Sequence, residues 1–145
     1  MLRIVPSIHR ATHRIGLFLA DLSDAGLSQG EAHILARLWS TERATIAELH
    51  ADLAHRRSTL TSILDRLTER GYVTREVGER DRRTFVVSLT PRGTVVARHV
   101  DARLRGLERA VAAKVSKHDL QAFRKVLAAV ETVARQSTPA ARTRR

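Results

Sequence analysis

The chain has 145 residues, a length typical of one domain that buries a core of its own. Its formal net charge of +11 favours a polyanionic partner, and its aromatic content of only 3% predicts a core of Leu, Val, Ile and Ala that suits packed helices. The absence of cysteine excludes disulfides and thiolate metal sites.

The first predicted element is a helix from about Pro6 to Ser23, in which Ile8, Ile15 and Leu19 recur at helical intervals. The apolar run in MLRIVPSIHR is too short for a signal peptide, and no stretch of the chain approaches the length of a membrane span. We therefore expect a cytoplasmic protein that has no membrane partner.

Two shorter helices are predicted next, and each begins with a capping box. Ser28 with Glu31, and Thr45 with Glu48, have the spacing at which a hydroxyl and a carboxylate bind each other's backbone N–H groups. The apolar residues at helical spacing are Ile34, Leu35 and Leu38 in the first helix, and Ile46, Leu49 and Leu53 in the second.

A further helix is predicted to end at Gly71, because glycine readily adopts the positive φ that stops a helix. One side carries Leu60, Ile63, Leu64 and Leu67, and the other side is short, hydroxylic and basic. That second side suits contact with base edges and phosphates, although the same residues would also make an ordinary solvated face. The candidate DNA contacts here are Arg56, Arg57, Ser58, Thr59, Thr61, Ser62 and Arg66.

A two-stranded ribbon with an arginine-rich tip follows this helix. Residues 72–77 form one β-like run, and Phe85, Val87 and Leu89 alternate with polar residues in the next. The segment between them, residues 78–83, reads GERDRR. Arginines on a narrow protruding loop fit the minor groove, where the negative potential is concentrated. The candidate contacts on this loop are Arg80, Arg82 and Arg83.

This order of elements predicts a winged helix-turn-helix at about residues 28–90 and favours DNA binding over a merely solvated face. The predicted fold class is mainly α (α+β). The charge supports nucleic-acid binding without locating it: residues 54–93 have nine basic and five acidic residues, a net +4, whereas residues 94–145 have twelve and four, a net +8.

Two helices are predicted to complete the chain. Thr90 and Pro91 open the first, as a hydroxyl cap followed by proline at the first helical position, and Ser116 caps the last. The apolar stripes of the first and last helices exceed what one winged domain covers, which predicts a homodimer; an intramolecular bundle is the alternative. We predict a single domain, residues 1–145, with dimerisation helices at about 6–23 and 91–135 and a disordered basic tail at about 137–145.

The segment LTSILDRLTERGYVTR (Leu60 to Arg75) and the pattern D-x-R-x-x-x-x-x-L-T-x-x-G resemble the MarR (multiple antibiotic resistance regulator) family of bacterial transcription factors. The residues of the second pattern are Asp81, Arg83, Leu89, Thr90 and Gly93. The resemblance implies a homodimer whose terminal helices interlock and whose winged domains reach successive major grooves of a pseudo-palindromic operator. It also implies that Arg83 enters the minor groove and that Asp81 orients the wing.

Two positions depart from the family pattern. His55 stands where an apolar turn residue is common, and Arg56 stands where Ser or Thr normally caps the recognition helix. These changes affect the local cap and not the fold, and they suggest that Arg56 contacts a phosphate. The absence of cysteine excludes the cysteine-based peroxide sensing known in one branch of the family.

The resemblance also implies a small aromatic or phenolic effector, bound between the dimer helices and the winged domain. The candidate lining residues are His9, His13, Phe18, His33 and Trp39. His9 and His13 have an i, i+4 spacing that is compatible with a metal, but no cysteine or placed carboxylate accompanies them, so neither a metal site nor a cofactor is expected. For Trp39, core packing is the alternative to ligand contact.

No glycine-rich phosphate loop, nucleophile motif or isolated carboxylate pair indicates an enzyme. The predicted function is a dimeric, sequence-specific transcriptional regulator, a repressor that releases DNA on binding a small molecule. The alternative is a winged-helix module that coats DNA or assembles proteins without an effector.

Overall fold

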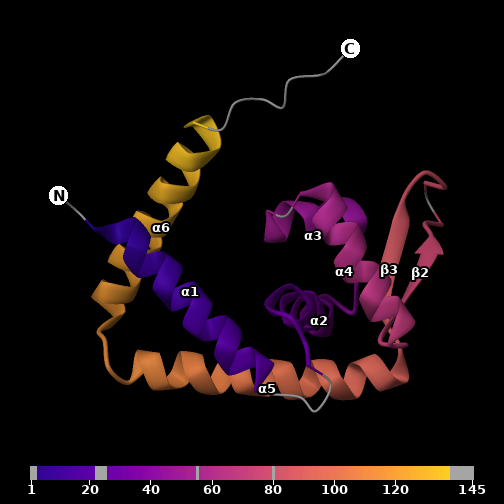
Figure 1. Cartoon of the computed structure of the whole chain (residues 1–145), viewed down its shortest axis with the longest axis horizontal. Coiled ribbons are helices and arrows are strands. Elements are labelled where there is room, and N and C mark those ends of the chain that lie inside the picture. Colours follow the sequence, from indigo (N-terminus) through magenta and orange to yellow (C-terminus); the bar gives the residue numbers. More distant parts are fainter. Residues whose placement is uncertain (1–2, 22–25, 55, 80, 138–145) are drawn as a thin grey trace. The chain divides into compact units, whose positions relative to one another are not determined.

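The structure, a computed structural model, describes residues 3–21, 26–54, 56–79 and 81–137, which form six helices and three strands (Figure 1). The mainly helical fold with a small antiparallel sheet confirms the predicted fold class. In chain order the elements are α1 (Ile4–Ala20), α2 (Gln29–Thr41), β1 (Arg43–Thr45), α3 (Ile46–Leu53), α4 (Arg57–Glu69), β2 (Val73–Val77), β3 (Phe85–Leu89), α5 (Pro91–Ala112) and α6 (Lys117–Ser137).

The chain divides into two compact units, Met1–Leu104 and Arg105–Arg145, and the boundary falls within α5. The first unit holds the winged helix-turn-helix, and the second holds the end of α5 and all of α6. No helix within the described ranges combines the length and the apolar character that crossing a bilayer requires.

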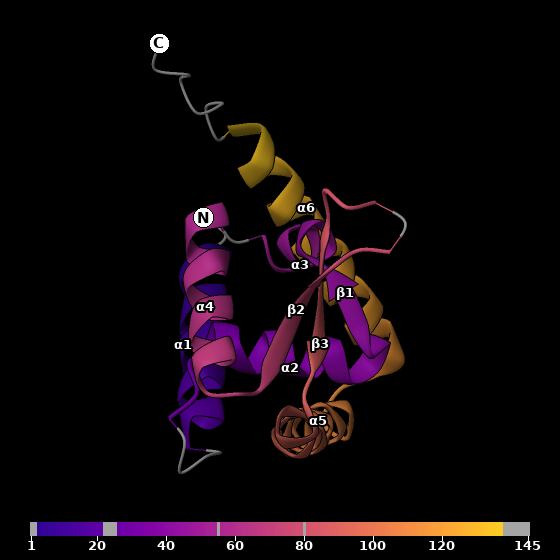
Figure 2. The same cartoon turned by 90° about the vertical axis from the view of Figure 1, so that its right-hand side faces the viewer.

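The sheet has the strand order β1-β3-β2, and both pairings are antiparallel. β2 and β3 pair from Val73 opposite Leu89 to Val77 opposite Phe85, and they form the predicted wing (Figure 2). β1 pairs with the other edge of β3, directly after α2. The sequence analysis did not predict this third strand.

Both predicted capping boxes are present at the starts of α2 and α3. Ser28 Oγ accepts a hydrogen bond from the Glu31 N–H at 3.2 Å, and Glu31 Oε2 accepts one from the Ser28 N–H at 2.7 Å. Thr45 and Glu48 form the same two bonds at 3.1 Å and 2.7 Å. Each box satisfies backbone donors that the first turn of a helix leaves without partners.

The first helix differs from its predicted bounds. α1 begins at Ile4, so Pro6 lies inside the first turn and does not start the helix. Proline is tolerated there because the N–H groups of a first turn have no partner within the helix. α1 ends at Ala20, and the predicted end at Ser23 lies outside the described residues.

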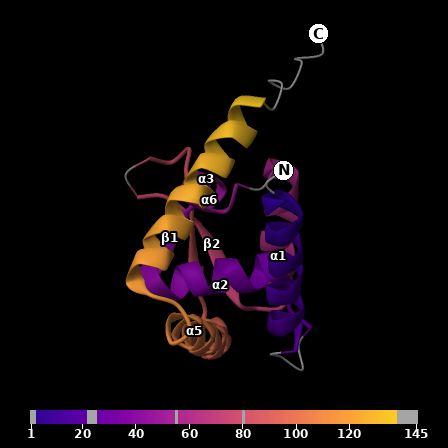
Figure 3. The ribbon, with the colours of Figure 1, turned by 90° about the vertical axis from the view of Figure 1, so that its left-hand side faces the viewer.

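The core of the first unit is aliphatic, as the composition predicts. Leu19 of α1, Leu35 of α2, Leu49 of α3 and Leu64 of α4 are all buried in it. Figure 3 shows α2 extending from α1 to β1, which makes α2 central to this packing. Among the described residues, Glu31 of α2 is the only charged side chain that is buried.

The end of α4 is tied to the start of α5 through the backbone of Tyr72. Gly71 has a φ of +71°, as expected for a residue that ends a helix. The Gly71 N–H donates to the Thr68 carbonyl and the Tyr72 N–H donates to the Leu67 carbonyl, both at 2.9 Å, which is a Schellman motif. The Thr90 N–H then donates to the Tyr72 carbonyl at 3.0 Å.

Thr90 and Gly93 of the wing pattern have distinct roles at this junction. Thr90 caps α5 as predicted, since its Oγ1 accepts from the Gly93 N–H at 2.9 Å while donating to the Gly71 carbonyl at 2.6 Å. A Cβ placed on Gly93 would lie 1.8 Å from the Tyr72 carbonyl oxygen. The first turn of α5 therefore approaches the backbone at Tyr72 so closely that only glycine fits.

In the second unit, α6 begins with a capping box that includes the predicted cap Ser116. Asp119 N–H donates to Ser116 Oγ at 3.1 Å, and Ser116 N–H donates to Asp119 Oδ2 at 2.9 Å. No described residue of α6 is buried within the single chain. Phe123 is 55% exposed and Val133 is 60% exposed, so much of the apolar surface of this helix is uncovered in one copy.

We predict that Gly93→Ala destabilises the fold by roughly 1–3 kcal/mol, because the added methyl group must push α5 away from Tyr72. Urea denaturation followed by circular dichroism, at one fixed protein concentration, measures the change. Gly106→Ala in the same helix is the matched control. A Cβ at Gly106 meets nothing within 4 Å, so this change should stabilise the helix by about 0.5–1 kcal/mol. Equal effects of the two substitutions would contradict the prediction.

Candidate nucleic-acid interface

The helix α4 has one buried side and one exposed side, as its sequence predicts. Its buried residues are Leu60, Ile63, Leu64 and Leu67. With about 3.6 residues per turn, a line of exposed side chains runs along the opposite side. The residues of this line, which we call the reading line, are Ser58, Ser62, Asp65 and Glu69. Its first half is hydroxylic and its second half is acidic, so the N-terminal half of α4 is the part suited to an anionic partner.

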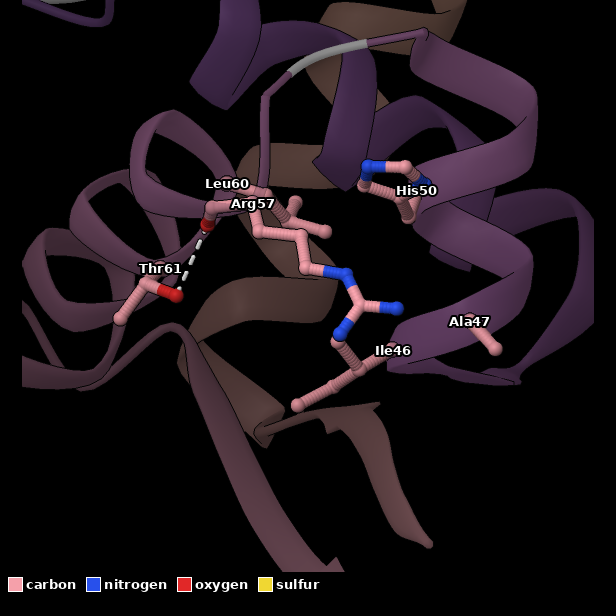
Figure 4. Close-up of a pocket in the computed structure, with 6 residues that line it drawn as sticks. All are labelled: Ile46, Ala47, His50, Arg57, Leu60 and Thr61. Carbon is pink, nitrogen blue, oxygen red and sulfur yellow. Dashed lines mark hydrogen bonds between the residues drawn. The ribbon is translucent and has the colours of Figure 1, made fainter. Parts of the chain in front are cut away.

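Arginines lie on the two flanks of the reading line. Arg57 reaches from α4 towards α3, where its guanidinium lies close to Ile46 (Figure 4). On the other flank, Arg66 Nε donates to Glu31 Oε1 of α2 at 3.3 Å. A helix that lies in the major groove has a phosphate backbone on either side, so both flanks can place a cation near a phosphate.

The N-terminus of α4 has no side-chain cap. Arg56 occupies the N-cap position and makes no capping hydrogen bond, as its residue type predicts, while Ala54 ends α3 with a left-handed φ of +50°. His55, the other departure from the family pattern, lies outside the described residues. The first N–H groups of α4 carry the positive end of the helix dipole. This end and the exposed Arg56, Arg57 and Thr59 suit contact with a phosphate.

The hydroxyl groups near the reading line donate to the helix itself. Thr61 Oγ1 donates to the Arg57 carbonyl at 2.9 Å, and Ser62 Oγ donates to the Ser58 carbonyl at 3.0 Å (Figure 4 shows the first of these). Each hydroxyl has one donor and two acceptor positions. With the donor used inside the helix, both oxygens present lone pairs to an approaching base.

A cavity of about 340 Å³ lies between α3 and α4, on the flank of α4 that carries Arg57 (Figure 4). It combines an apolar wall with one guanidinium. Its lining residues are Ile46, Ala47, His50, Arg57, Leu60 and Thr61. The sequence analysis did not predict this cavity, because its residues come from two helices and form no local pattern.

The turn of the wing is held by Asp81, the residue predicted to orient it. Asp81 Oδ1 accepts from the Arg83 N–H at 2.9 Å, and the Asp81 carbonyl accepts from the Thr84 N–H at 3.0 Å. Arg82 and Arg83 are exposed on this turn. Arg80, the third predicted contact of the wing, lies outside the described residues. The described arginines of the wing tip are thus exposed on a turn that Asp81 holds by hydrogen bonds.

Ion pairs brace the helices of this segment. Arg75 of β2 bonds Asp65 of the reading line, and its Nε donates to Thr68 Oγ1 of α4 at 3.4 Å. Arg37 of α2 bonds Asp52 of α3 at 2.5 Å. The first pair joins α4 to the wing and offsets one of the two acidic charges on the reading line.

Residues 27–85, from the start of α2 to the first residue of β3, match the model of the MarR family. This segment of the chain is similar to the MarR family. The match contains α4 and the turn of the wing, so the resemblance predicted from the sequence is confirmed for the segment that holds the candidate interface.

One curated relative is the organic hydroperoxide resistance transcriptional regulator of Bacillus subtilis (strain 168), which is 34% identical over 62 residues. That match covers 43% of this chain and 42% of the relative, so it spans less than half of either protein.

The solved structures extend the likeness in fold to almost the whole chain. A probable transcriptional regulator from Pseudomonas aeruginosa is 26% identical with a TM-score of 0.69, and the match covers 89% of this chain and 97% of that one. The S. aureus MepR–DNA complex has a TM-score of 0.79 over 92% of this chain and 99% of that one. At 14% identity, MepR shows that the fold is shared and no more.

The predicted effector residues do not line the cavity between α3 and α4, nor the cavity beside β1 and the turn of the wing. His9 and His13 are exposed on α1, and no group of three or more metal-binding side chains occurs within the described ranges. Phe18 is half-buried, with the Arg103 guanidinium 4.8 Å from its ring centre. His33 is half-buried, and Trp39 packs against the core, which supports the core-packing alternative for Trp39. The effector site remains a prediction.

The sequence analysis did not predict the Glu31–Arg66 contact. Glu31 is 1% exposed, and its two carboxylate oxygens bond to Ser28 and Arg66. Burial alone would raise the pKa of Glu31, but hydrogen bonds from Ser28 and the cations Arg70 and Arg66 outweigh it and hold the pKa below the ordinary value of 4.5. The buried carboxylate is therefore ionised at neutral pH.

We predict that Glu31→Gln weakens the fold by roughly 1–3 kcal/mol near neutral pH, because it removes a buried charged acceptor. The pKa of Glu31 is lower in the folded chain than its ordinary value of 4.5. Its stabilisation is therefore complete above that pH and is lost as the pH falls through the lower folded value. The difference between wild type and variant in urea denaturation should shrink towards acid pH.

Glu48→Gln, in the exposed capping box of α3, is the matched control and should cause a smaller loss. A difference between wild type and Glu31→Gln that stays constant from neutral to acid pH would contradict the predicted role of the Glu31 charge.

Proposed function

We propose that the chain is a sequence-specific DNA-binding transcriptional regulator, a homodimeric repressor that a small molecule releases from its operator. The observation that carries the proposal is the exposed, hydroxyl-lined first half of α4 beside an arginine-tipped wing, within the segment that matches the MarR family. Such a regulator would work in the cytoplasm, where the chromosome lies.

In this proposal α4 is the recognition helix and lies in the major groove. Ser58, Thr61 and Ser62 contact base edges, and the last two do so as acceptors because their hydroxyl protons are bonded within the helix. Arg57 and Arg66 contact phosphates from the two flanks. Arg56, Thr59 and the first N–H groups of α4 add contacts with the backbone at its N-terminus.

The wing follows the minor groove in the same proposal. Arg83 enters the groove, Arg82 and Arg80 lie beside it, and Asp81 orients the turn by accepting from the Arg83 N–H. The negative potential of a narrow minor groove favours arginine there. The similarity to the fold of MepR, whose solved structure is a complex with DNA, supports this use of the fold.

The apolar surface that one copy leaves uncovered supports the proposed homodimer. In α1, Val5 is 67% exposed and Leu17 is 59% exposed, and in α6 Phe123 and Val133 are exposed to a similar extent. A second copy would cover these faces, since the exposure of such apolar stripes to water is unfavourable in free energy. We propose that residues 1–145 act as one domain, with dimerisation helices at about 6–23 and 91–135. The basic tail beyond residue 137 lies outside the described residues.

The proposed effector is a small aromatic or phenolic compound that contacts His9, His13, Phe18, His33 or Trp39. The solved structure of PcaV from Streptomyces coelicolor contains the natural ligand of that regulator, and PcaV shares the fold of this chain with a TM-score of 0.74. The B. subtilis relative is named as a transcriptional regulator of organic hydroperoxide resistance. This chain has no cysteine, so a thiol cannot serve as a peroxide sensor here.

The alternative is a module that coats DNA, or assembles proteins, without an effector. The observation that favours DNA coating is the net charge of +8 in residues 94–145, outside the winged segment. DNase footprinting on fragments selected from genomic DNA separates the two. A discrete protected palindrome, with half-sites about 10 base pairs apart, supports the regulator. Protection that spreads uniformly with protein concentration supports the coating module.

We predict that Arg83→Ala weakens binding to the selected operator by about tenfold or more, because it removes the minor-groove contact. Fluorescence anisotropy at a fixed salt concentration measures the dissociation constant. Arg109→Ala, which removes the same charge from an exposed position of α5, is the control and should change the constant much less. Equal losses for the two variants would show that only the total charge matters.

A Thr61→Ala, Ser62→Ala double variant should change the preferred operator sequence, since a discriminating base contact contributes about 1–3 kcal/mol. Selection from random duplex DNA, followed by sequencing, gives the consensus of each protein. An unchanged consensus would exclude α4 as the recognition helix.

A further inference from the structure

The capping box of α2 differs from the other two described boxes of the chain. The acids of those boxes, Glu48 in α3 and Asp119 in α6, are exposed to solvent. Glu31 makes the same capping contacts, yet its side chain is only 2% exposed. Capping does not require burial, so the burial of Glu31 needs a second explanation.

The two oxygens of the Glu31 carboxylate bind different partners, and the second partner provides this explanation. Oε2 accepts from the Ser28 N–H at 2.7 Å and completes the capping box, while Oε1 accepts from Arg66 Nε at 3.3 Å. The first bond anchors the carboxylate to the start of α2. The second bond crosses to α4, 35 residues further along the chain. Glu31 therefore connects a fixed point of the core to one side chain of the recognition helix.

Arg66 keeps an exposed edge in this arrangement. Its side chain is 47% exposed even though Nε is bonded to Glu31. A guanidinium is planar and its donors have a fixed geometry, so holding Nε also fixes the direction of the two Nη nitrogens. Arginine has a long side chain with many rotamers, and a fixed rotamer loses less conformational freedom when it binds.

We propose that Glu31 is a positioning residue for DNA binding, whose buried carboxylate holds the Nη edge of Arg66 towards a phosphate beside the recognition helix. This inference rests on the proposed function and adds a buried residue of α2 to the determinants of affinity. It makes a distinctive prediction, because Glu31 carries a negative charge near a polyanion. By charge alone, Glu31→Gln should tighten DNA binding. By positioning, the same substitution weakens it.

The test is a double-mutant cycle of Glu31→Gln and Arg66→Ala. The probe is a fluorescein-labelled, mixed-sequence duplex of about 30 base pairs, long enough for two half-sites about 10 base pairs apart. A mixed sequence suffices because phosphate contacts do not depend on base sequence. Dissociation constants are measured over a range of salt concentrations, well below the unfolding temperature of each variant.

In the wild-type background, Glu31→Gln should weaken binding about three- to tenfold; in the Arg66→Ala background only the charge effect is left, so the same change should not weaken binding. Arg66→Ala alone should make the plot of log association constant against log [salt] shallower by about 0.9, as expected for one lost phosphate contact. Glu48→Gln, in the exposed capping box of α3 and outside the proposed dimerisation helices, is the matched control: it also removes one capping carboxylate and should neither weaken binding nor change the salt slope.

Arg66→Lys provides an independent measurement that does not depend on the folding of the Glu31 variant. Lysine keeps the charge but lacks the planar fork that Glu31 holds, so Arg66→Lys should bind as weakly as Arg66→Ala to within about twofold. Recovery of wild-type affinity with lysine overturns the inference. Tighter binding by Glu31→Gln in the wild-type background, or an equal effect of that change in both backgrounds, also overturns it. A wild-type chain that binds no duplex at low salt overturns the proposed function itself.

Discussion

The close approach of α5 to the backbone at Tyr72 is the constraint on which the winged segment depends. Within a few residues, Gly71 ends α4, Tyr72 leads into β2, and Thr90 both follows β3 and caps α5. The missing side chain of Gly93 lets the helix lie directly against a peptide group. Backbone hydrogen bonds at Tyr72, together with the short side chain of Thr90, therefore fix the end of α4 relative to the base of the hairpin.

Around this junction, α4 is braced by ion pairs on both sides. Arg75 bonds Asp65 from the strand β2, and Glu31 bonds Arg66 from α2. Arg37 and Asp52 join α2 to α3 in the same segment. A binding surface holds its geometry best when the side chains behind it are themselves fixed. The exposed line of α4 is thus supported from both neighbouring elements before any partner arrives.

The sequence predicted best those features that arise from neighbouring residues. Ser28, Thr45 and Ser116 were recognised as caps because a capping hydroxyl acts only three residues away, and Gly71 because positive φ is a property of one residue. The apolar stripe of α4 follows from helical periodicity alone.

Features that depend on packing between distant segments were not predictable in this way. No local pattern links Glu31 to Arg66, and the strand β1 is three residues long and exists because β3 offers it an edge. The same reason applies to the cavity between α3 and α4, whose lining is shared by two helices. The predicted effector residues came from a family resemblance and form no single periodic pattern, so periodicity gave no means of testing them.

Because of the register of the hairpin, the length of the wing can change without a change in the structure at its base. Strand pairing runs without interruption from Val73 opposite Leu89 to Val77 opposite Phe85, and the turn lies wholly beyond the last pair. Residues inserted in pairs at that turn would lengthen both strands by about 3.3 Å per residue and leave the junction at Tyr72 untouched. The reach of the arginine-bearing tip is therefore a quantity that protein engineers can vary by insertion, while the anchoring of α4 stays the same.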